Sequence, residues 1–257
     1  MSTHVVIPAR RASTRLPDKP LADIDGLPMI VRVARQASLS RAQDVVVAVD
    51  DEEVLAVVRD AGFDAVLTAA EHPSGSDRVM EVARQRHWPE HDIVINVQGD
   101  EPLLPPAIID QLADYMAASN SIEIATLSEP ITSVADFFNP NVVKVLTDAN
   151  DQALYFSRAP IPFPRDEMLA DAVSDAMVQN NNVQRHVGVY GFRVHALQRF
   201  VNLNDSRLER IERLEQLRWL EQGGRIAVLQ SVASIPGGVD TPQDLERVRR
   251  IVTGQPA

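Results

Sequence analysis

Short runs of β-branched residues alternate with amphipathic segments through the first half of the sequence, and this alternation constrains the fold more than any other feature. Strands are predicted at residues 45–49, 65–67, 93–97 and 122–127, and helices at 52–61, 77–86 and about 105–118. Strands separated by amphipathic helices are typical of a largely parallel sheet covered by helices. We therefore expect an α/β, doubly wound, Rossmann-like fold with a mostly parallel sheet.

The rhythm changes between about residues 130 and 185. Two strand-like runs, 142–146 and 153–157, flank the turn sequence Asp148-Ala149-Asn150-Asp151, and a proline-rich stretch follows. This pattern predicts an inserted β-hairpin and loop. The alternation then resumes, with strands at 187–192 and 226–232 and helices at 207–221 and 242–252. We expect a single domain over residues 1–257 that contains this insertion.

The charge balance excludes several classes of partner. Lys and Arg total 25 against 36 Asp and Glu, a formal net charge of -11, and broad binding of nucleic acid or of a membrane surface needs widespread positive potential. With no cysteine, disulfides and thiolate zinc sites are excluded. Residues 1–4 lack the features of a signal peptide, and no apolar run approaches about 18 residues. A cytoplasmic protein is expected.

Positive charge is concentrated near the start of the sequence. The apolar run Val5-Val6-Ile7 leads into a segment, residues 8–20, with four cations and one acid: Arg10, Arg11, Arg15, Lys19 and Asp18. Guanidinium and ammonium groups at a strand end suit a polyphosphate. The segment has no glycine, so it is neither a Walker A motif nor a G-x-G-x-x-G motif. It predicts a nucleoside triphosphate site held largely by side chains; the alternative is a solvated basic loop.

Two later sequences offer carboxylates. Asp100 follows the predicted strand 93–97, and ligands of open α/β sheets bind outside the carboxyl ends of strands. Its hard oxygens suit Mg²⁺, although Gly-Asp-Glu-Pro also has the chemistry of a simple turn. The second sequence is Pro236 to Asp244, in which Thr241 and Asp244 fit a helix cap. That leaves Asp240, just outside the cap and preceded by two glycines, as a second candidate metal ligand.

Together with these sequences, further motifs make the combination recognisable. The sequence resembles the 3-deoxy-manno-octulosonate cytidylyltransferases, or CMP-Kdo synthetases, along nearly its whole length, and the motifs keep their order. They are Pro8-Ala9-Arg10 with Ala12 to Pro17 and Lys19-Pro20, His72 to Arg78, Asn96 to Pro102, Tyr155 to Ala159, Arg185 to Tyr190, Leu214 to Arg218, and Gly238 to Pro242. The resemblance implies a fold of the nucleotide-diphospho-sugar transferase type.

The resemblance implies transfer of CMP from CTP to the anomeric hydroxyl of the acidic sugar Kdo, with release of pyrophosphate, for lipopolysaccharide synthesis. Attack on an α-phosphate surrounded by negative oxygens is catalysed mostly by alignment and charge stabilisation. Arg10, Arg15 and Lys19 are assigned to the triphosphate, with a hydrogen bond from Ser13. By similarity, Asp100 and Asp240 are the Mg²⁺ ligands. Lys19, Arg10 and both aspartates are the expected catalytic residues.

The acceptor is an anion, so a cation and several polar groups are expected to receive it. By similarity these are Arg78, facing the sugar carboxylate, Glu215, facing its hydroxyls, and Gln98, His186 and Tyr190. Without the resemblance, Glu215 would be a solvated residue of a helix that also holds a Glu209–Arg213 pair, and His186 and Tyr190 would be ordinary sheet residues.

Three positions depart from the family pattern. Asp18 stands where glycine is usual; it tolerates left-handed backbone but adds negative charge beside the triphosphate. Arg11 replaces a common aromatic residue as a surface change, and Ser76 replaces threonine but keeps the hydroxyl.

Several alternatives remain open at this point. The acceptor is Kdo, its 8-amino analogue or another acidic sugar such as a sialate. Alternatively, the protein is a hexose-phosphate nucleotidyltransferase or a regulatory module without catalysis.

The resemblance also implies a homodimer, because the family is typically dimeric. The hairpin region, residues 142–164, is the expected dimer surface, since Phe156, Ile161 and Phe163 need cover.

Overall fold

The computed structural model describes residues 1–13 and 15–254. The chain forms two compact units. Unit 1 comprises Met1–Asn120, Val189–Val201 and Val232–Ala257, and unit 2 comprises Ser121–Gly188 and Asn202–Ser231. The predicted insertion, about residues 130–185, lies inside unit 2. Among the described residues, no helix combines the length and apolar character needed to cross a bilayer.

Unit 1 is built on a mostly parallel sheet with the strand order β10-β6-β1-β4-β5. These strands are β1 (Thr3–Ala9), β4 (Asp44–Val49), β5 (Asp64–Leu67), β6 (Ile93–Asn96) and the second half of β10 (Gln184–Arg193). β1 pairs in parallel with both β4 and β6, β4 pairs in parallel with β5, and β10 is antiparallel to β6. The carboxyl ends of β1, β4 and β6 therefore lie at one edge of the sheet.

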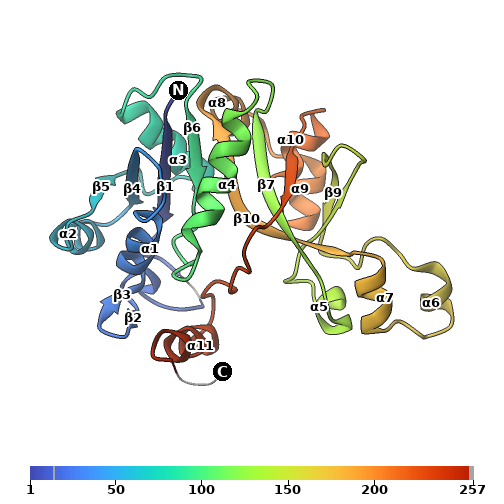
Figure 1. Cartoon of the computed structure of the whole chain (residues 1–257). Coiled ribbons are helices and arrows are strands. Elements are labelled where there is room, and N and C mark those ends of the chain that lie inside the picture. Colours follow the sequence, from blue (N-terminus) through green and yellow to red (C-terminus); the bar gives the residue numbers. More distant parts are fainter. Residues whose placement is uncertain (14, 255–257) are drawn as a thin grey trace. The chain divides into compact units, whose positions relative to one another are not determined.

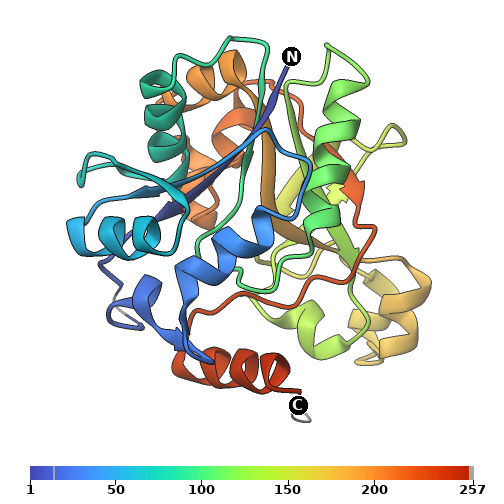
Figure 2. The same cartoon turned by 60° about the vertical axis from the view of Figure 1, so that its left-hand side comes forward.

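Helices cover both faces of this sheet (Figures 1 and 2). α1 (Met29–Ala37) and α4 (Pro106–Ala117) lie on one face, and α3 (Gly75–Gln85) and α8 (Val194–Val201) lie on the other. The remaining elements of unit 1 are η1 (Lys19–Leu21), β2 (Asp23–Ile24), β3 (Leu27–Pro28), α2 (Glu52–Asp60) and α11 (Pro242–Val252). This arrangement confirms the doubly wound α/β fold predicted from the alternating pattern.

Several helices begin at the polar residues that the sequence offers as caps. The Asp51 carboxylate accepts hydrogen bonds from the first turn of α2, and the Ser74 hydroxyl does so for α3. Thr241 and Asp244 form a reciprocal capping box at the start of α11, as predicted. Such caps satisfy backbone donors that have no partner within the helix.

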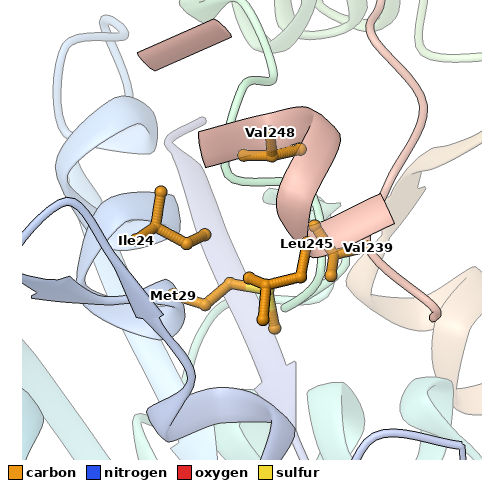
Figure 3. Close-up of a cluster of buried hydrophobic side chains, with 5 residues drawn as sticks. All are labelled: Ile24, Met29, Val239, Leu245 and Val248. Carbon is orange, nitrogen blue, oxygen red and sulfur yellow. The ribbon is translucent and has the colours of Figure 1, made fainter. Parts of the chain in front are cut away.

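A small apolar cluster attaches α11 to the segment that follows the basic loop (Figure 3). It consists of Ile24, Met29, Val239, Leu245 and Val248, all buried. Ile24 is in β2, Met29 begins α1, and Leu245 and Val248 lie on α11. Burial of five such side chains stabilises the attachment by several kcal/mol, at roughly 1.5–3 kcal/mol per fully buried side chain. The cluster therefore fixes the chain just before Asp240.

Unit 2 contains the predicted hairpin. Its strands are β7 (Ile124–Pro130), β8 (Lys144–Thr147), β9 (Ala153–Ser157), the first half of β10, and β11 (Ala227–Gln230). β8 pairs antiparallel with β9 and with β10, and β11 pairs in parallel with β7. Its helices are α5 (Val134–Phe138), α6 (Arg165–Leu169), α7 (Asp175–Asn180), α9 (Arg207–Glu212) and α10 (Leu217–Glu221). The insertion thus carries three short helices that the sequence did not predict.

The single helix predicted over residues 207–221 is wrong. α9 ends at Glu212, the next residue, Arg213, adopts a left-handed conformation with φ 55°, and α10 begins only at Leu217. Tertiary contacts hold the break, because the Glu212 carboxylate accepts hydrogen bonds from the Ser157 hydroxyl at 2.6 Å and the Arg158 amide at 2.9 Å. In place of the predicted Glu209–Arg213 pair, Arg218 donates to the Glu209 carboxylate.

Candidate active site

The basic segment forms one wall of a pocket of about 330 Å³ at the carboxyl edge of the sheet in unit 1. Cations, carboxylates and backbone all contribute to its lining. The lining residues are Pro8, Ala9, Arg10, Ala12, Ser13, Arg15, Lys19, Pro20, Met29, Gln98, Gly99, Asp100 and Asp240. Every residue predicted to hold the triphosphate or Mg²⁺ is in this set. Sequence reasoning missed the apolar wall of Pro8, Ala9 and Met29.

Lys19 and the two predicted metal ligands meet in this pocket. The Lys19 ammonium donates to Asp100 Oδ2 at 2.7 Å and to Asp240 Oδ1 at 2.9 Å. Arg15 Nη2 lies 3.0 Å from the same oxygen of Asp240. Burial lowers the pKa of Lys19, but the two carboxylates outweigh burial and hold that pKa above its ordinary value. Lys19 is therefore a fixed positive charge between two carboxylates that are 140 positions apart in the sequence.

Backbone packing explains why the two carboxylates converge. Asp100 lies four residues after the end of β6, and its carbonyl oxygen accepts a 2.9 Å hydrogen bond from the Val239 amide. A Cβ at Gly99 would lie 2.8 Å from the Pro8 carbonyl oxygen, so only glycine lets the β6 turn approach the end of β1 so closely. The apolar cluster of Figure 3 holds Val239 in place.

The other residues predicted for the nucleotide lie on the basic loop itself. Arg10 donates to the His72 carbonyl oxygen at 2.7 Å, which restrains its guanidinium beside the pocket. The Ser13 hydroxyl accepts a hydrogen bond from the Leu16 amide at 3.3 Å and so shapes the loop. Asp18 adopts φ 50°, which is the left-handed backbone expected where glycine is usual.

Arg78 lies outside the pocket lining. Its side chain is fully buried, and its guanidinium donates to the Thr68 hydroxyl and, at 3.3 Å, to the Asp50 carboxylate. Burial lowers the pKa of Arg78, opposed by Asp50. In this conformation, Arg78 braces the ends of β4 and β5; the contact with a sugar carboxylate stays a prediction that requires these partners to be exchanged.

The remaining residues predicted for the sugar are divided between the units. Gln98 lines the pocket, and Tyr190 lies on β10 opposite Asn96 of β6, stacked on Phe192. His186 and Glu215 belong to unit 2. Glu215 lies between α9 and α10 rather than on a helix. Their roles toward a sugar stay predictions.

His186 is neutral in the folded protein. Its Nε2 lies 3.0 Å from the Thr126 hydroxyl, and its ring meets the edge of the Phe156 ring. Burial, with a smaller effect from Arg185, lowers the pKa of His186 to about 3. The side chain can therefore exchange a hydrogen bond but does not supply a positive charge near neutral pH.

This burial makes stability fall in acid. Below about pH 6.5 an unfolded histidine binds a proton that folded His186 does not bind, so the free energy of unfolding drops by about 1.4 kcal/mol per pH unit until pH approaches the folded pKa. We expect urea denaturation to show that the wild type loses about 2 kcal/mol more between pH 6.5 and 5 than His186→Gln does. His87→Asn, at an exposed position, should follow the wild type. Parallel pH profiles for wild type and His186→Gln would contradict this assignment.

The pocket suits a magnesium ion. Mg²⁺ is commonly held by one or two carboxylates together with phosphate oxygens of the substrate and water. Asp100 and Asp240 supply two carboxylates, both aimed at the point where the Lys19 ammonium lies. No cluster of three or more His, Cys, Asp or Glu side chains suited to a metal occurs within residues 1–13 and 15–254. Any metal held here would therefore depend on the nucleotide for further ligands.

Comparisons with known proteins identify the family of this chain. The cytidylyltransferase family matches residues 4–226. A 3-deoxy-manno-octulosonate cytidylyltransferase of Cellvibrio japonicus is 52% identical over 252 residues, which cover 98% of both chains. A protein of the same name from Psychrobacter cryohalolentis is 49% identical, over 96% of this chain and 93% of its own.

Solved structures give the same result. A CMP:2-keto-3-deoxy-manno-octonic acid synthetase complexed with CTP matches with a TM-score of 0.88 and 40% identity, covering 99% of both chains. A cytidylyltransferase from Leptospira borgpetersenii shares the fold, with a TM-score of 0.62 at 15% identity, over 100% of this chain and 89% of its own. Because the family match and these relatives extend over most of the sequence, the chain belongs to the cytidylyltransferase family.

Proposed function

We propose that this protein transfers CMP from CTP to the anomeric hydroxyl of Kdo and releases pyrophosphate, which activates the sugar for lipopolysaccharide synthesis. The observation that carries the proposal is the meeting of Lys19, Asp100 and Asp240 in a pocket walled by Arg10 and Arg15. Support comes from two relatives, 52% and 49% identical in sequence, that are named for this activity. The cytoplasm, where CTP is made, is the proposed location.

The chain's own residues supply alignment and charge. Arg10, Arg15 and Lys19 would neutralise triphosphate oxygens, and opposite unit charges about 4 Å apart are worth roughly 4 kcal/mol at an effective dielectric of 20. Gly99 lets the turn after β6 pack against the Pro8 carbonyl oxygen, which brings Asp100 beside the basic segment. Arg10 is restrained by the His72 carbonyl oxygen before substrate arrives, and a charge that is already in place needs little reorganisation in the transition state.

Magnesium dependence is part of the proposal. Asp100 and Asp240 would hold Mg²⁺ in exchange for the Lys19 ammonium, which would then be free to contact phosphate. When bound, the ion would lower the pKa of the acceptor hydroxyl and stabilise charge on the α-phosphate.

A pyrophosphate-release assay tests the activity. We expect release with CTP and Kdo when Mg²⁺ is present, and loss of release when the metal is removed by a chelator. UTP in place of CTP, and a sialate or the 8-amino analogue in place of Kdo, test the nucleotide and the acceptor. Faster turnover with either alternative sugar, or full activity without a divalent cation, would contradict the corresponding part of the proposal.

We also propose that the protein is a homodimer through the hairpin of unit 2. The Phe156 side chain is buried within the unit, contrary to expectation, but Leu154 on the same hairpin and Phe163 are each 61% exposed. Large apolar side chains that stay exposed in a single chain are candidates for such a contact. A mass from solution scattering that corresponds to one chain would end this part of the proposal.

A further inference from the structure

The loop between β1 and η1 has two sides with different chemistry. The side that lines the pocket presents Arg10, Arg15 and Lys19. The opposite side lines a second hollow of about 470 Å³, whose lining includes Arg11, Asp18, Asp50 and Asp51. Ala12 and Ser13 line both spaces, so this part of the loop is the wall between them. Contacts on the second side therefore act on the same stretch of backbone that carries the cations of the first side.

Arg11 makes most of the contacts on that second side. Its guanidinium lies 2.9 Å from the Asp18 carboxylate, 3.0 Å from that of Asp51 and 2.6 Å from that of Glu53. Its backbone amide donates to the Asp50 carboxylate at 2.9 Å. Asp51 caps α2 and Glu53 lies in its first turn, so one residue joins the loop to a separate, rigid element.

The pairing with Asp18 also has an electrostatic effect. Asp18 directly precedes Lys19, and its carboxylate is 60% exposed. A carboxylate there repels an anion approaching Lys19 unless a cation neutralises it. The three carboxylates, with Asp18 first, raise the pKa of Arg11, so this cation is permanent at any working pH.

We propose that Arg11 is a positioning residue for the nucleotide: it clamps the basic loop to the start of α2 and neutralises Asp18 so that the loop attracts a triphosphate. Arg11 touches no substrate in this scheme, since it acts from the far side of the loop. The two positions form one unit, in which the acid at 18 is tolerated because of the arginine at 11. The inference rests on the proposed use of CTP.

A double-mutant cycle of Arg11→Ala and Asp18→Asn tests the clamp. Asparagine keeps the left-handed backbone at position 18 and removes only the charge. We expect Arg11→Ala to raise KM for CTP roughly tenfold with kcat changed less than twofold, an effect that shrinks at high ionic strength because exposed charges are screened. The double variant should have a KM closer to the wild-type value than Arg11→Ala has, because the uncompensated carboxylate is gone.

A control variant separates this role from a general loss of structure. Arg86→Ala removes an exposed arginine that is paired with Asp64 at 2.6 Å, and it should keep the wild-type KM. Hydrogen exchange without substrate should be faster over residues 10–18 in Arg11→Ala. An unchanged KM in Arg11→Ala, or a double variant as defective as Arg11→Ala, would overturn the inference. A wild-type protein that makes no CMP-sugar would instead overturn the proposed function, and the exchange result would still report on the clamp.

Discussion

Asp100→Asn is expected to lower kcat for CMP-sugar synthesis by about a thousandfold while the protein remains folded. Loss of one electrostatic group aimed at developing charge costs about 10²–10³ in rate, and an amide oxygen is a much weaker ligand for Mg²⁺ than a carboxylate. The variant also removes one of the two carboxylates that share the Lys19 ammonium. Asp240→Asn should have a similar effect. Steady-state kinetics at saturating CTP and Mg²⁺ measures the loss.

The matched control is Asp64→Asn. Asp64 is an exposed aspartate in an ion pair with Arg86, on β5, and its loss should leave kcat within twofold of the wild type because exposed pairs contribute little. Circular dichroism should give the same spectrum for all three variants. Undiminished synthesis by Asp100→Asn or Asp240→Asn would contradict the assignment of this pocket as the place of catalysis.

Lys19→Met is the second large effect that we expect. The Lys19 side chain is only 14% exposed, so its charge is weakly screened, and removing it should lower kcat/KM for CTP by about 10²–10³. In the protein without nucleotide, the same change leaves Asp100 and Asp240 without their shared cation. Binding of Mg²⁺ alone, measured by calorimetry, should therefore become tighter as turnover falls.

Opposite signs in these two measurements make the test specific. A general loss of structure would weaken both Mg²⁺ binding and turnover, whereas exchange between ammonium and metal at one position strengthens the first. Arg86→Met, on the surface, should change neither. Weaker Mg²⁺ binding in Lys19→Met, or unchanged kcat/KM, would contradict the exchange described for this pocket.

Much of the fold of unit 1 could be predicted because its signals are local. The apolar runs of β1, β4 and β6, and the cap formed by Thr241 and Asp244, each occupy only a few neighbouring residues. The edge where Asp100 and the basic loop meet also follows from parallel strands, whose carboxyl ends lie together. These features depend on sequence pattern more than on distant contacts.

The parts that could not be predicted depend on contacts between distant residues. The break at Arg213 is held by Glu212, whose partners Ser157 and Arg158 lie more than 50 positions away. The burial of Arg78 beneath Asp50 has no local signature. The sequence predicts that Lys19 and the two aspartates lie near one another. It does not predict that Lys19 pairs with both, because charge pattern does not determine which ions pair in a pocket.

The attachment of Asp240 through the apolar cluster has a consequence for how the protein is made. Lys19 and Asp100 are synthesised long before Val239, Leu245 and Val248. These three late residues pack against Ile24 and Met29 and so hold Asp240 in the pocket. With the role proposed for Asp240, the pocket gains its second carboxylate only after this late segment has been synthesised and has folded back onto the earliest one. We therefore expect a chain that terminates before residue 239 to be inactive.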